Sequence, residues 1–147
     1  MLQDLTCDLD QAVAHIFRVM LALDCTPIQE CPQPVLPHSC LSATVRFSGG
    51  VAGWFAVAVD PRAARVLAAH LTGMPEQELS NALSSDTVAE LCNVIAGNWK
   101  SRRPPPLGSC SLSPPSPANC HPARDPSILT RLYTFASHQL VLQLNLC

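Results

Sequence analysis

Hydrophobic residues recur every three or four positions in three stretches of the chain, which is the spacing of an amphipathic helix. Each stretch also carries end signals. Acidic residues open the first, Asp60 and Pro61 precede the second and Gly73 ends it, and Ser84 has the composition of a cap before the third, which lysine and arginine close. A short helical turn is also expected within residues 75–83. The pattern predicts three main helices, at residues 8–23, 62–71 and 86–100.

The first half of the chain also has the pattern of a β-hairpin. Residues 41–47 alternate between apolar and polar side chains, and residues 51–59 form a longer apolar run. Ser48, Gly49 and Gly50 lie between them and have the composition of a tight turn. The longer run indicates a strand that is covered on both faces.

A second hairpin is predicted at the end of the chain. Residues 129–135 and 138–146 have strand character, and a bend at residues 136–137 joins them. In the last strand leucine on one side alternates with amides such as Gln143 on the other, so this hairpin is expected to have one solvated face. Together the elements predict an α+β fold with two layers, a mostly antiparallel sheet formed by hairpins with helices packed on it.

Composition narrows the classes of function. The 147 residues are 48% hydrophobic and 14% charged, which suits a single domain over residues 1–147. A formal charge of −2 without a densely basic stretch excludes a nucleic-acid or anionic-membrane footprint. The longest apolar run, at residues 47–59, is far shorter than the roughly 20 residues that span a bilayer. Residues 1–10 carry three Asp and no Lys or Arg, unlike a secretory signal, so a cytoplasmic location is expected.

The eight cysteines are too few for a disulfide scaffold and show no CxxC pair and no repeated spacing. We expect reduced thiols, several of them buried as small hydrophobic side chains. One alternative stays open, a thiol or metal-dependent module in which Cys110, Cys120 and His121 bind zinc.

The third predicted helix carries the candidate chemistry. Each residue of a helix turns by about 100°, so four residues share one narrow side opposite the apolar one: Asp86, Glu90, Asn93 and Gly97. A solvated helix face is the ordinary explanation of such a row. Asn is a mediocre helix former, however, and Gly costs about 1 kcal/mol relative to Ala, so their presence favours a binding function. Glu90 can pair with a cation, and the Asn93 amide can both donate and accept, as holding a water against an electrophile requires.

The spacing Asp86-x3-Glu90-x2-Asn93, followed after 21 residues by Pro115, resembles the signature of the CheC/CheX/FliY family of chemotaxis phosphatases. The flanking residues 90–98 and 47–53 resemble CheX-like members in particular. The resemblance supports the α+β fold described above.

The chain departs from the family pattern at residues 103–126, which hold eight of the 14 prolines. We expect this segment to be irregular, with one short strand around residues 110–113. The strand that should lie beside the motif helix in such a family is therefore not evident in the sequence.

The resemblance implies an activity and residue roles. Family members hydrolyse the phospho-aspartate of CheY-like response regulators, and the regulator supplies Mg²⁺, so this chain is expected to bind no cofactor. By carry-over, Glu90 would pair with a lysine of the regulator and Asn93 would hold the attacking water. Gly97 and Pro115 would belong to the docking surface. Asp86 would either lie at the edge of that contact or cap the helix. A non-catalytic adaptor that binds a receiver domain is the alternative function.

The number of motifs bears on the oligomeric state that the resemblance implies. CheC and FliY relatives carry two motifs, whereas this chain has one. Its nearest second match, Glu78 with Asn81, lacks the acidic residue four positions earlier and is interpreted as a loop. A single motif is similar to the CheX type, which implies a homodimer built through sheet edges.

Overall fold

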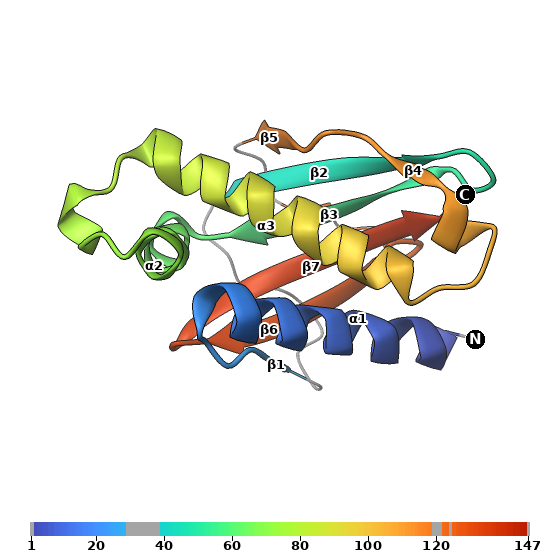
Figure 1. Ribbon diagram of the computed structural model, residues 1–147, viewed down its shortest axis with the longest axis horizontal. Coiled ribbons are helices and arrows are strands. Elements are labelled where there is room, and N and C mark those ends of the chain that lie inside the picture. The colour runs from blue at the N-terminus through green and yellow to red at the C-terminus, as the bar shows by residue number, and fades with distance from the viewer. Residues whose placement is uncertain (1, 29–38, 119–121, 124, 147) are drawn as a thin grey trace.

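A computed structural model describes residues 2–28, 39–118, 122–123 and 125–146. A twisted antiparallel sheet forms one layer, and the three long helices lie together on one face of it (Figure 1). This is the predicted α+β arrangement. The helical elements are α1 (Leu2–Ile16), η1 (Phe17–Leu21), α2 (Pro61–Thr72), η2 (Glu76–Glu78), α3 (Asn81–Ser101) and η3 (Leu107–Ser109).

Within the described ranges the sheet has seven strands. They are β1 (Thr26–Pro27), β2 (Leu41–Ser48), β3 (Gly53–Val59), β4 (Ser111–Leu112), β5 (Ser116–Ala118), β6 (Leu129–Phe135) and β7 (His138–Leu146). Their order is β1-β6-β7-β3-β2-β4, and β5 also pairs with β2. Both predicted hairpins are confirmed, as β2–β3 and β6–β7.

The first two helices match the predictions in kind, with one shifted boundary. α1 begins six residues before the predicted start, and a π-helical turn, η1, ends it at Ala22 with a left-handed backbone of φ 52°. α2 has the expected ends. The Asp60 carboxylate accepts hydrogen bonds from the backbone N–H of Arg62 at 2.6 Å and of Ala63 at 3.2 Å, and Gly73 closes the helix with φ 75°.

α3 begins at Asn81, five residues before the predicted start. The Ser80 hydroxyl caps it by accepting from the backbone N–H of Leu83 at 3.1 Å. Ser84 resembled a cap in the sequence, but its hydroxyl donates to the Ser80 carbonyl from inside the helix. The capping role of Asp86 is therefore wrong, because Asp86 lies in the second turn. The interpretation of Asn81 as loop is also wrong.

Backbone conformations with positive φ occur in both hairpins. Ala136 and Ser137 both have positive φ, 45° and 65°, as a two-residue hairpin turn requires. Gly53 begins β3 with φ 155°, and a Cβ there would lie 2.1 Å from the Asn145 carbonyl oxygen of β7. Only glycine fits at this contact between the two central strands.

The expected solvated face of the second hairpin is wrong at its centre. Val141 and Gln143 point away from the helices, yet they are only 1% and 4% exposed. The chain crosses this face at Ala123, whose backbone N–H donates to the Gln143 side chain at 3.1 Å and whose carbonyl accepts from it at 2.7 Å. The amide that appeared to face water is therefore buried with both of its polar groups paired.

The proline-rich segment is more regular than the sequence predicted. β4 lies within the short strand expected around residues 110–113, but β5 was not expected. Between them Ser113 exchanges hydrogen bonds with the backbone of Arg46, donating through its N–H and accepting through its hydroxyl, each at 2.9 Å. The segment therefore lies along the outer edge of β2 and restores the strand beside α3 that was not evident in the sequence.

Aromatic packing fixes α3 on the sheet. Trp99 is fully buried, and its ring centroid lies 5.9 Å from that of Phe47 and 6.1 Å from that of Phe55. One turn or two earlier, Cys92 and Ile95 are also fully buried on the same side. The helix is thus held rigidly along its apolar side, which determines the side that it presents to solvent.

Candidate functional site

The four residues predicted to share one side of α3 do so in the structure, and we call them the α3 ridge: Asp86, Glu90, Asn93 and Gly97. Of residues 84–100, only Asp86 and Glu90 are exposed, whereas Asn93 and Gly97 are half-buried. The ridge lies on the side of α3 that faces away from the sheet. The amphipathic interpretation of this helix is therefore confirmed.

The polar side chains of the α3 ridge form no interaction that stabilises the described part of the fold. In the part of the chain that the structure describes, Asp86, Glu90 and Asn93 form no side-chain hydrogen bond or ion pair. Glu90 and Asn93 are three residues apart, so their Cβ atoms lie about 5–6 Å from each other on one helix surface. A carboxylate that only accepts and an amide that also donates are thus presented side by side on a rigid support.

The remaining predicted site residue, Pro115, lies apart from α3 in sequence but near it in the fold. It is half-buried on the connection between β4 and β5, at the sheet edge beside α3. Leu112 of β4 is also close, because a Cβ placed on Gly97 would lie 3.9 Å from its Cδ1 atom. The sequence did not indicate this neighbour, because the residues of a short proline-rich segment do not show which of them will lie next to a helix.

Two buried cysteines, Cys92 and Cys25, are structural. Cys92 lies on the side of α3 that faces the sheet, where its thiol donates to the Ala43 carbonyl at 3.4 Å and burial raises its pKa to about 12. Burial likewise raises the pKa of Cys25 to about 12. Both thiols stay protonated near neutral pH and are poor nucleophiles.

The zinc alternative concerns residues that the structure describes only in part. Cys110 is buried, and its thiol donates to the Leu107 carbonyl at 2.9 Å. Cys120 and His121 lie outside the described residues. Within the described ranges, no group of three or more His, Cys, Asp or Glu side chains could hold a metal ion.

The basic residues at the C-terminal end of α3 fall into two groups, two arginines that pair with α1 and a lysine that does not. Arg103 forms an ion pair with Asp8 of α1 at 2.6 Å, and the Arg102 guanidinium donates to Asn98 at 2.9 Å and to Gln11 of α1 at 3.2 Å. These contacts join α3 to α1. Lys100 takes no part in them and has no side-chain partner among the described residues.

Comparison with known proteins defines the family. The family model described as chemotaxis phosphatase CheX matches residues 41–122, a range that runs from β2 through α3 to the end of the β5 region. This is more than half of the chain, and the chain therefore belongs to the CheX family. No curated protein sequence matches it significantly.

Solved structures share the fold at low sequence identity. CheX from Vibrio vulnificus has a TM-score of 0.78 and 15% identity, over 98% of this chain and 97% of that one. CheX in the CheX-CheY-BeF3-Mg²⁺ complex from Borrelia burgdorferi has a TM-score of 0.70 and 17% identity, over 97% of each chain. FliY from Thermotoga maritima has a TM-score of 0.62 and 15% identity, over 94% of this chain and 83% of that one.

None of the helices in the described ranges has the length and apolar character needed to cross a membrane.

Proposed function

We propose that this protein is a phosphatase that hydrolyses the phospho-aspartate of a CheY-like receiver domain, with the α3 ridge as its active surface. One observation carries the proposal. In a chain of the CheX family, α3 presents an adjacent carboxylate and amide that have no partner among the described residues. The CheX–CheY complex from Borrelia burgdorferi supports the choice of a receiver domain as the partner.

In the proposed reaction Glu90 and Asp86 bind the receiver, and Asn93 positions the attacking water. The Glu90 carboxylate pairs with a lysine at the receiver's phosphorylation site and so fixes the position of α3, while Asp86 contacts the rim of the receiver one turn earlier. The Asn93 amide holds a water in line with the phosphorus atom. The water oxygen forms a bond to phosphorus, the bond from phosphorus to the aspartate oxygen breaks to leave the aspartate carboxylate, and the proton lost by the water passes to solvent as inorganic phosphate is released. The receiver contributes Mg²⁺, which neutralises charge on the phosphoryl oxygens.

The activity is tested by measuring inorganic phosphate release from phosphorylated CheY-like receivers of the source genome, with and without this protein. We expect release to accelerate with added protein and to require Mg²⁺. Tight binding of the receiver without acceleration would show the alternative function, a non-catalytic adaptor. If the protein neither binds a receiver nor accelerates release, the proposal is wrong.

Substitution of Glu90 by Ala is expected to raise KM for the phosphorylated receiver at least about tenfold, since a charge-assisted contact at the interface is lost. The matched control is Glu78→Ala. Glu78 is also an exposed carboxylate, but it belongs to η2 and lies outside the α3 ridge. Steady-state phosphate release at varied receiver concentration measures both. Equal KM values for the two variants would remove Glu90 from the docking surface.

Gly97→Ala is expected to raise the stability of the fold and to weaken docking of the receiver. A Cβ at residue 97 meets only the Leu112 side chain, at an ordinary contact distance of 3.9 Å, so α3 should gain about 0.5–1 kcal/mol of stability. The added methyl group also projects from the ridge, where we expect it to keep the receiver's backbone at a distance and to raise KM. Urea unfolding and phosphate release are the two measurements. A more stable variant with unchanged KM would show that Gly97 lies outside the contact.

A cytoplasmic homodimer is also proposed, in line with a single-motif CheX chain. β4, Ser113 and β5 occupy the outer edge of β2, so a second copy would pair elsewhere on the sheet. Light scattering on the purified protein measures the oligomeric state directly.

A further inference from the structure

The α3 ridge continues beyond Gly97 to a lysine. Lys100 lies seven residues after Asn93, and Asp86 lies seven residues before it. Seven helical residues make nearly two turns, so each of these side chains projects about 20° from the one before it, at intervals of about 10 Å along the axis, and the whole row from Asp86 to Lys100 turns by only about 40°. The ridge therefore has carboxylates at its N-terminal end, the Asn93 amide at its centre and an ammonium group at its C-terminal end.

Two neighbouring basic residues show what a purely structural cation does at this helix end. Arg102 and Arg103 turn toward α1 and bind Gln11 and Asp8. Lys100 projects to the other side, is half-buried, and has no partner in the described ranges. A favourable interaction with the helix dipole explains a cation in the last turn, but not its alignment with Asn93 and Asp86.

We infer that Lys100 determines which receivers dock and in which orientation, by pairing with an acidic side chain at the rim of the receiver's phosphorylation site. The inference rests on the proposed function. A site that binds Mg²⁺ and a phosphoryl group is built with carboxylates, so a receiver offers acidic residues close to the group that Asn93 would face. With Glu90 on a cation and Lys100 on a carboxylate, one docking orientation makes two attractive contacts. The reversed orientation sets like charges against each other, which is strongly disfavoured.

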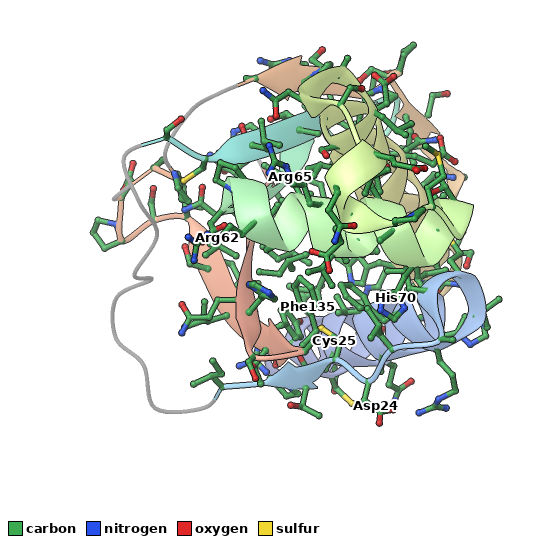
Figure 2. All side chains as sticks on the ribbon, turned by 90° about the vertical axis from the view of Figure 1, so that its left-hand side faces the viewer. Asp24, Cys25, Arg62, Arg65, His70 and Phe135 are labelled. Atoms are coloured by element: carbon green, nitrogen blue, oxygen red, sulfur yellow. The ribbon has the colours of Figure 1, made fainter. Side chains whose placement is uncertain are left out.

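The inference predicts a change in KM that leaves the chemical step intact. Lys100→Glu should raise KM for the phosphorylated receiver about tenfold or more and leave kcat within about twofold, because Lys100 acts on docking and not on the water. Lys100→Arg keeps the charge and should behave like the wild type. The matched control is Arg62→Glu, which reverses an exposed cation on α2 outside the ridge (Figure 2).

Two experiments test whether Lys100 forms a direct ion pair with the receiver or only adds to the overall electrostatic attraction. They are added salt and charge reversal in the receiver. Exposed charges are screened over about 8–10 Å at physiological ionic strength, so the wild-type KM should rise with added NaCl more steeply than that of Lys100→Ala. Acidic residues at the rim of the receiver are then changed to lysine one at a time. Restoration of a low KM for Lys100→Glu by one of these changes, and not by the others, identifies the partner side chain.

The test uses receivers in the phosphorylated form for kinetics and loaded with Mg²⁺ and beryllofluoride for binding. A rise in KM or Kd for Lys100→Glu but not for Arg62→Glu supports the inference, and the Kd arm applies even if the protein is an adaptor. An active wild type whose KM is equal in both variants overturns the role of Lys100 and leaves the phosphatase proposal standing. If no receiver binds, both proposals fail.

Discussion

Replacement of Asn93 by Ala is expected to lower kcat for phosphate release at least about a hundredfold, with KM for the phosphorylated receiver changed far less. In the proposed reaction the amide only positions a water, and positioning accounts for most of the catalysis of phosphoryl transfer. The side chain is half-buried on the solvent side of α3 and has no partner among the described residues, so its removal leaves no buried polar group unpaired. Single-turnover phosphate release, with this protein in excess, measures the chemical step directly.

Asn98 provides the matched control on the same helix. It too is half-buried, but it lies five residues further on and projects about 140° away from Asn93, where its carbonyl oxygen accepts from Arg102 at 2.9 Å. Asn98→Ala should lower stability slightly and keep the wild-type kcat. A wild-type kcat in both variants would exclude water positioning by Asn93, whereas an equal loss of kcat in both would indicate a general disturbance of α3.

Gly53→Ala is expected to destabilise the protein by about 3–5 kcal/mol, a large part of the stability of a small domain. The added Cβ would lie 2.1 Å from the Asn145 carbonyl oxygen, and a backbone atom in a central strand cannot move aside cheaply. The residue also has φ 155°, which L-amino acids rarely adopt. Urea unfolding followed by circular dichroism or tryptophan fluorescence measures the change.

Gly73→Ala separates the two causes of that loss. Gly73 also has a positive φ, 75°, but a Cβ there meets no atom within 4 Å. This variant should lose only about 1 kcal/mol, the cost of the left-handed backbone alone. If Gly53→Ala were no more damaging than Gly73→Ala, the close contact between β3 and β7 would not exist in solution.

The parts of the fold that local patterns could predict were those with repeated hydrophobic spacing or a strong turn signal. The β6–β7 hairpin is confirmed to the residue, and α2 has the expected cap at Asp60 and the expected end at Gly73. Contacts between distant segments were not predictable in this way. The burial of Gln143 depends on Ala123 crossing the sheet, and β5 depends on a register against β2.

The candidate site was predictable to a similar extent and for the same reason. Helical geometry alone placed Asp86, Glu90, Asn93 and Gly97 on one side of α3, and burial in the structure agrees. The helix start was misplaced because Ser84 has the composition of a cap, whereas Ser80 performs that task. Lys100 was attributed to the helix end together with its two arginine neighbours, and only their pairing with α1 shows that it differs.

The proline-rich segment along the outer edge of β2 affects how the protein behaves at high concentration. An open strand edge offers unpaired N–H and C=O groups to any other chain, which is a common route to aggregation. Here β4, Ser113 and β5 occupy that edge, and Pro114, Pro115 and Pro117 supply no N–H for a further strand. The segment that departs most from its family pattern thus terminates the sheet. Its deletion should expose the edge of β2 and cause the protein to self-associate through that strand.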